Sequence, residues 1–139
     1  MEIRKAEPRD LPSCVDLSQI KEFKIEGKPL PDKIYLGEAL ESGIFLVAEE
    51  DNKILGFILA FKLTKSNAYL DLLTVSTETR GKGIGKKLIL TLKDELNEQG
   101  IKDYFLIAST SNEKTLNFYR KNNLTECKNY TVFSDSIKK

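Results

Sequence analysis

The sequence has no histidine among its 139 residues. This absence excludes hydrolases with a Ser-His-Asp triad or a Cys-His pair, proteases built on an HExxH zinc helix, and every acid–base mechanism that depends on an imidazole. Carboxylates, tyrosine, lysine, cysteine and backbone dipoles are the groups that remain for chemistry.

Cysteine is also scarce. Cys14 and Cys127 lie far apart in the chain and do not show the spacing of metal ligands. We therefore expect both to be apolar packing residues or inert thiols, and we expect no bound metal.

Long apolar runs and an excess of one charge are both missing. No run approaches the ~20 apolar residues of a membrane-spanning helix, and the N-terminal stretch MEIRKAEPRD lacks the apolar region of a signal peptide. Lys and Arg total 22 against 21 Asp and Glu, so no strong field is available for nucleic acid or an anionic membrane. We predict a cytoplasmic protein without either partner, in which any anion site is local.

Apolar periodicity predicts one α/β domain over residues 1–139. Runs rich in β-branched and aromatic residues predict strands at 2–6, 44–50, 53–63, 68–75, 103–109 and 129–133. The dipeptide DN between the second and third runs predicts a hairpin. Helical spacing and capping residues predict helices at 8–20, 33–41, 84–96 and 113–121. The third of these helices carries an apolar stripe that ends at Gly100.

The stretch RGKGIG, Arg80 to Gly85, joins the apolar run YLDLLTV to the third predicted helix. A glycine-rich turn that opens a helix lets backbone N–H groups approach an anion. Two nucleotide motifs fail at this turn, because the P-loop and the dinucleotide fingerprint both need a glycine at position 86, which is lysine. The turn therefore predicts an anion site of another class.

Two motifs together resemble the GNAT superfamily of N-acetyltransferases. The first is R-x-x-G-x-G, and the second is the stretch NEKTLNFYRKNNL, which is similar to the superfamily pattern N-x-x-A-x-x-F-Y-x-K-x-G-F. Thr115 stands for the small residue, and Asn123 stands for a glycine whose left-handed backbone asparagine also adopts. The matching residues are Arg80, Gly83, Gly85, Asn112, Phe118, Tyr119 and Lys121.

The resemblance implies a GNAT fold, with a mixed, mostly antiparallel central sheet flanked by helices and splayed parallel strands at the acetyl-CoA site. It implies that the anion is the coenzyme A pyrophosphate, that the pantetheine arm pairs with one strand as an extra strand would, and that a backbone N–H near Val75 holds the thioester carbonyl. The residues implied to bind acetyl-CoA are Leu73, Thr74, Val75, Arg80, Gly81, Lys82, Gly83, Ile84, Gly85, Lys86, Asn112 and Tyr119.

The resemblance gives Tyr119 the role of general acid, since a phenol with a pKa of about 10 stays protonated at neutral pH and can donate to a thiolate. Asp71 is the candidate general base, because strand alternation would put it on the same face as Leu73 and Val75.

Other groups could serve as the general base in place of Asp71. Glu22, Glu26 and Asp32 lie in the least regular region and could reach an acceptor, although solvated surface charge explains each of them more simply. A water relay would need no named base. Ile107 stands where ribosomal-protein acetyltransferases of this superfamily have a glutamate, which argues against that subtype.

The sequence thus predicts an N-acetyltransferase that moves an acetyl group from acetyl-CoA to a primary amine of a small molecule or protein, by direct attack in a ternary complex. A non-catalytic acyl-CoA-binding module is the alternative, and a nucleotide-binding regulator is disfavoured by the two failed motifs. We expect a monomer or homodimer whose partners are acetyl-CoA and an amine acceptor.

Overall fold

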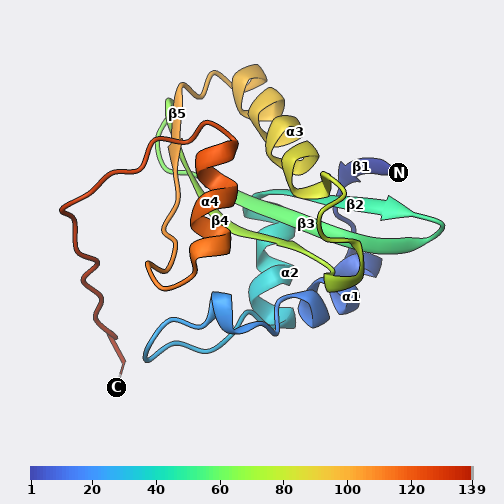
Figure 1. The fold of residues 1–139 in the computed structure, drawn as a ribbon. Coiled ribbons are helices and arrows are strands. Elements are labelled where there is room, and N and C mark those ends of the chain that lie inside the picture. Colours follow the sequence, from blue (N-terminus) through green and yellow to red (C-terminus); the bar gives the residue numbers. More distant parts are fainter. Residues whose placement is uncertain (139) are drawn as a thin grey trace. The chain divides into compact units, whose positions relative to one another are not determined.

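Five strands form one sheet in the order β1-β2-β3-β4-β5 (Figure 1). The strands are β1 (Glu2–Lys5), β2 (Ile44–Glu50), β3 (Lys53–Lys62), β4 (Asn67–Val75) and β5 (Asp103–Phe105). Neighbours are antiparallel except β4 and β5, which are parallel, so the predicted mixed sheet is confirmed. The computed structural model describes residues 1–138 and divides into two units, Met1–Ile107 and Ala108–Lys139. The single domain over residues 1–139 stays a prediction.

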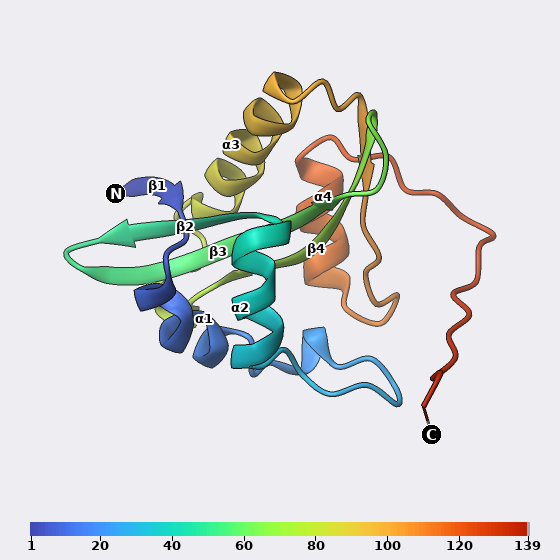
Figure 2. The same cartoon turned by 180° about the vertical axis from the view of Figure 1, so that it is seen from behind.

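The sheet is flanked by helices. They are η1 (Pro8–Asp10), α1 (Leu11–Leu17), η2 (Lys21–Phe23), α2 (Lys33–Ser42), η3 (Thr77–Thr79) and α3 (Ile84–Glu98). Helices α1 and α2 cover one face of the sheet and α3 covers the other (Figures 1 and 2). The core on the first of these faces joins Leu11 and Leu36 to Phe57, Leu59 and Leu72 of the sheet.

The predicted hairpin forms between β2 and β3. Asp51 and Asn52 both have positive φ, 51° and 63°, which is the backbone of the tight turns that match the twist of paired strands. Asparagine and aspartate tolerate this conformation better than most residues. The dipeptide DN therefore forms the turn that pairs β2 with β3.

Helix α3 forms as its apolar stripe predicts. Ile84, Leu88, Leu92 and Leu96 are all buried. Gly100 ends the helix at φ 79°, and the N–H of Ile101 donates to the carbonyl of Leu96 at 2.9 Å. This pattern satisfies carbonyls that the last turn would otherwise leave without partners.

The second unit contains α4 (Glu113–Lys121). The Asn112 side chain accepts a hydrogen bond from the Thr115 N–H at 3.2 Å and so caps the helix. Asn123 has φ 68°, which confirms that it supplies the left-handed backbone expected of a glycine in the motif.

Two strand predictions are wrong in the part of the chain that the structure describes. The strand expected at 103–109 ends at Phe105, because its pairing with β4 stops at the register Tyr69↔Phe105. The run 129–133 forms no strand, and Tyr130 and Phe133 are 85% and 91% exposed. Alternating apolar residues form a strand only where a neighbouring edge pairs with them.

Candidate active site

The two parallel strands separate part of the way along β4. Pairing with β5 covers only Asn67 to Tyr69, whereas β4 continues to Val75. Among residues 1–138, no strand pairs with the rest of this β4 edge. The backbone N–H and C=O groups along it can therefore pair with an extended ligand, in the way that an added strand would.

Gly56 brings β3 close to the end of β4. A Cβ atom at this position would lie 2.7 Å from the carbonyl oxygen of Thr74 and 3.2 Å from the Cα of Val75, so any larger residue would push the strands apart. Gly56 lies outside both sequence motifs. An isolated glycine inside a strand is a known sign of close backbone approach and could have identified it.

The glycine-rich turn leads from β4 into α3. Gly81 and Gly83 have φ 83° and 81°, and no atom lies within 4 Å of a Cβ built on either residue. The carbonyl of Gly83 accepts the first helical hydrogen bond, from the Lys87 N–H at 3.1 Å. The N–H groups of residues 84–86 therefore have no acceptor within the helix and point to its N-terminal end. This end of the helix also has a partial positive charge.

Three exposed cations surround this turn: Arg80, Lys82 and Lys86. The Nε of Arg80 donates to the Val75 carbonyl at 3.1 Å and so connects the turn to the end of β4. None of the three forms an ion pair with a carboxylate of the described chain. The structure thus combines an open strand edge, free helical N–H groups and uncompensated positive charge, the features that a phosphate-containing ligand would need.

Asp71 lies at an irregularity in β4. Leu59 pairs with Leu72 and Ala60 with Leu70, so Asp71 is the extra residue of a β-bulge. The bulge interrupts the alternation of side chains. The prediction that Asp71 shares a face with Leu73 and Val75 is therefore wrong.

The face of Asp71 follows from its contacts. Its Oδ2 accepts a hydrogen bond from the hydroxyl of Tyr35, which belongs to α2. Leu72, the next residue, packs in the core against α1 and α2. Thr74 faces the same way, since its hydroxyl donates to the Leu17 carbonyl of α1 at 3.4 Å. Leu73 points to the opposite face. Asp71 and Leu72 are therefore consecutive residues on one face of β4, and the regular alternation resumes after them.

Partial burial changes the acid–base properties of the Asp71 carboxyl. The half-buried position of Asp71 raises the pKa of its carboxyl, and the hydrogen bond from Tyr35 partly opposes that rise. The same burial, together with the neighbouring carboxylate, raises the pKa of Tyr35. Tyr35 was missed by sequence reasoning, because nothing local marks a contact between residues so far apart in the chain.

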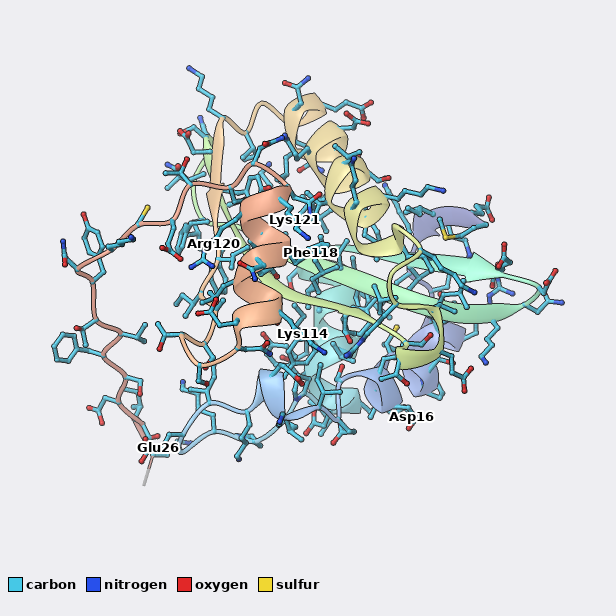
Figure 3. The ribbon with its side chains drawn as sticks, in the orientation of Figure 1. Asp16, Glu26, Lys114, Phe118, Arg120 and Lys121 are labelled. Atoms are coloured by element: carbon cyan, nitrogen blue, oxygen red, sulfur yellow. The ribbon has the colours of Figure 1, made fainter. Side chains whose placement is uncertain are left out.

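The alternative carboxylates have simpler explanations. Asp32 caps α2, and its Oδ1 accepts from the Tyr35 N–H at 2.8 Å. Glu22 and Glu26 are exposed on the segment before α2, where Figure 3 labels Glu26. These positions agree with the interpretation of all three as structural or solvated groups.

Tyr119 and Asn112 lie in the second unit. Tyr119 is half-buried on α4, and its ring meets that of Phe118 edge to face with 5.3 Å between centroids. Figure 3 shows Phe118, Arg120 and Lys121 along the same helix. Asn112 is a helix cap, as described above, and the roles of Tyr119 and Asn112 toward acetyl-CoA stay predictions.

The two cysteines differ in their exposure to solvent. Cys14 is fully buried, and burial raises the pKa of its thiol to about 12. Cys127 is an exposed free thiol in the second unit. Among residues 1–138 there is no group of three or more His, Cys, Asp or Glu side chains that could hold a metal ion. In the same range, no helix has the length and apolar character needed to cross a membrane.

Comparison with known proteins gives one family. A family model described as "Acetyltransferase (GNAT) family" matches residues 11–123. An uncharacterized N-acetyltransferase of Methanocaldococcus jannaschii, MJ1530, is 34% identical over 95 residues, which are 68% of this chain and 58% of that protein. N-acetyltransferase 8F1 of Rattus norvegicus is 32% identical over 82 residues, 55% of this chain and 37% of that protein. The chain thus spans less than two thirds of the length of either relative.

Solved structures show the same fold. An aminoglycoside acetyltransferase, meta-AAC0020 from an uncultured soil metagenomic sample, was solved in complex with sisomicin. It superposes with a TM-score of 0.78 at 27% identity, over 99% of this chain and 96% of its own. The PaiA N-acetyltransferase of Thermoplasma acidophilum, in complex with coenzyme A, superposes with a TM-score of 0.75 at 23% identity, over 87% of each chain.

Proposed function

The chain belongs to the acetyltransferase (GNAT) family, and from this membership we propose that it transfers the acetyl group of acetyl-CoA to a primary amine of a small molecule or protein. The reaction is a direct attack of the amine in a ternary complex. The main support is the continuous path from the unpaired edge of β4 through Arg80 to the open N-terminus of α3.

The residues of this path fit acetyl-CoA. The backbone of Leu73 to Val75 pairs with the pantetheine arm, and a backbone N–H near Val75 holds the thioester carbonyl, where a well-aimed donor stabilises the transition state by about 3 kcal/mol. The N–H groups of Gly83 to Lys86, with Arg80, Lys82 and Lys86, bind the pyrophosphate. Gly81 gives the turn a residue with φ 83°, which glycine adopts without strain. When bound, acetyl-CoA supplies an activated acyl group.

Two side chains move protons. Asp71 accepts the proton that the acceptor nitrogen loses as it bonds to the acetyl carbon, and the raised pKa of this carboxyl makes it a better acceptor near neutral pH. Tyr119 donates a proton to the sulfur of coenzyme A as the carbon–sulfur bond breaks. Asn112 uses its Oδ1 to cap α4, and its amide nitrogen remains available for the pantetheine arm.

The aminoglycoside acetyltransferase similar to this chain suggests which acceptors to test first. The assay measures release of free coenzyme A thiol with sisomicin, a polyamine and a peptide with a free N-terminus. A Cys127→Ser background removes the exposed thiol that would react with the same reagent. We expect thiol release that needs both acetyl-CoA and an amine, together with mass-spectrometric evidence of an acetylated product.

Calorimetry with acetyl-CoA separates this function from the alternative. Tight binding of acetyl-CoA without turnover on any amine would favour a non-catalytic binding module. Absence of binding would contradict the assignment of the turn and the β4 edge.

A further inference from the structure

The contact between Tyr35 and Asp71 joins two elements that are distant in sequence. Tyr35 is the third residue of α2, and Asp71 is the bulged residue of β4. The tyrosine hydroxyl donates to Oδ2 of the carboxylate. The packing of α2 does not need this contact, because Leu36 and Ala39, which are 0% and 1% exposed, already bury the helix against the sheet. The residues assigned to acetyl-CoA binding do not include Tyr35.

The hydrogen bond leaves one carboxylate oxygen available. Oδ1 of Asp71 accepts no hydrogen bond from any of residues 1–138. A planar carboxylate that is held at one oxygen keeps the other pointing in a fixed direction. The bulge supports this orientation, because it turns the Asp71 side chain toward α2 and not toward α3.

The surroundings of Asp71 contain few other titratable groups. Tyr35 on α2 and Tyr69 on β4 are the groups of the described chain that face it, and no lysine or arginine pairs with it. Tyr69 gives Asp71 no hydrogen bond and packs its ring against Phe105, with 5.1 Å between centroids. Tyr35 is therefore the one described side chain whose removal changes the hydrogen bonding of Asp71.

We propose that Tyr35 is a positioning residue, which holds the Asp71 carboxylate in the orientation that accepts the proton of the acceptor amine. This inference rests on the proposed function, in which Asp71 is the base. Tyr35 is 41% exposed, so this contact lies where α2 meets solvent and not in the closed core. Helix α2 thereby takes part in the reaction although it carries no residue of either family motif.

The first test does not require activity. The Asp71 carboxyl is titrated by NMR in protein labelled with 13C at aspartate, and its signal is assigned with Asp71→Asn. The hydrogen bond from Tyr35 lowers the pKa of Asp71, so Tyr35→Phe should raise that pKa. Tyr69→Phe, which removes a hydroxyl nearby without removing a hydrogen bond to Asp71, should leave it unchanged. An unchanged titration in Tyr35→Phe overturns the proposal.

The second test follows kcat/KM against pH. The acidic limb of the profile should move to higher pH in Tyr35→Phe, in step with the NMR titration, and kcat/KM at neutral pH should fall roughly tenfold or more because the base is no longer held in place. Tyr69→Phe should retain the wild-type limb. Melting temperatures of both variants show whether a loss of activity comes from a loss of fold.

The two hypotheses fail in different ways. A wild type without acetyl transfer, in which Tyr35→Phe still shifts the Asp71 titration, contradicts the proposed function and supports the assignment of Tyr35 to Asp71. An active wild type whose pH profile is the same in Tyr35→Phe overturns the positioning role and leaves the proposed function in place.

Discussion

The proposed proton transfers depend on two side chains, the carboxylate of Asp71 on β4 and the phenol of Tyr119 on α4. Asp71 and Tyr119 stand out from the sequence because one lies on a strand beside the glycine-rich turn and the other lies in a motif. The orientation of Asp71 could not be predicted, since it depends on a bulge that exists only when β4 pairs with β3. The role of Tyr35 could not be predicted either, because its contact with Asp71 forms only after the chain has folded.

Tyr119→Phe tests the general acid. The variant keeps the ring and its packing against Phe118 and removes only the proton donor. If Tyr119 protonates the departing thiolate and transfer limits the rate, kcat should fall on the order of 10²-fold while the affinity for acetyl-CoA barely changes.

Tyr130→Phe is the matched control for this substitution, because it removes a phenol from an exposed residue of the same unit. Its kcat should equal that of the wild type. A fully active Tyr119→Phe would remove Tyr119 from the mechanism, and calorimetry with acetyl-CoA would show whether any loss came from weaker binding instead.

Helices and strands were predictable where the signal is local. The stripe of α3, the DN turn and the cap of α4 each depend on residues within one or two turns of chain, and all three form as expected. The predictions of a strand at 129–133 and of the end of β5 were wrong, because a strand needs a neighbouring strand edge and the sequence does not show which edges come together. The close approach at Gly56 belongs with them, since its partner Val75 lies on another strand.

Gly83→Val tests the turn that opens α3. Gly83 has φ 81°, a conformation that a valine adopts only with strain, and it directly precedes the free N–H groups of residues 84–86. The dissociation constant for acetyl-CoA should rise at least tenfold, equivalent to about 1.4 kcal/mol, as calorimetry would measure.

The other end of α3 supplies a control for backbone strain. Gly100 has φ 79° and also has open space where a Cβ would lie, so Gly100→Val should lower the melting temperature about as much as Gly83→Val does. Only Gly83→Val should weaken the binding of acetyl-CoA. Equal weakening in both variants would mean that strain, and not the loss of an anion site, explains the effect.

The chain as a whole is almost neutral, with a formal net charge of +1, yet one ion cluster ties its N-terminal elements together. Arg4 of β1 donates to both carboxylate oxygens of Asp10, at 2.8 and 2.9 Å, and to Glu49 of β2 at 2.9 Å. Asp10 is only 4% exposed and also accepts the Glu7 N–H at 2.8 Å. The arginine therefore compensates the buried charge of Asp10 and connects β1 with η1 and β2.

This cluster predicts how stability depends on pH. The hydrogen bond from Arg4 lowers the pKa of Asp10 in the folded protein, so Asp10 contributes stability that is present above its unfolded pKa of about 3.9 and is lost as the pH falls through the folded value. The contribution of Asp71 to the free energy of unfolding has the opposite sign, because the pKa of Asp71 is raised in the folded protein and its charge opposes folding at neutral pH. Acid unfolding should thus report on Asp10 and not on Asp71.

Urea unfolding between pH 2.5 and 7 tests this sign with two variants. Arg4→Met leaves the Asp10 carboxylate buried without its partner, so it should cost about 3 kcal/mol at pH 7 and flatten the loss of stability below pH 4. Asp71→Asn should keep the acid loss of the wild type and be at least as stable at pH 7, since it removes a half-buried charge while its side-chain oxygen still accepts from Tyr35. Parallel curves for Arg4→Met and the wild type would show that the cluster does not control acid stability, and a flattened curve for Asp71→Asn would reverse the assignment of the two carboxylates.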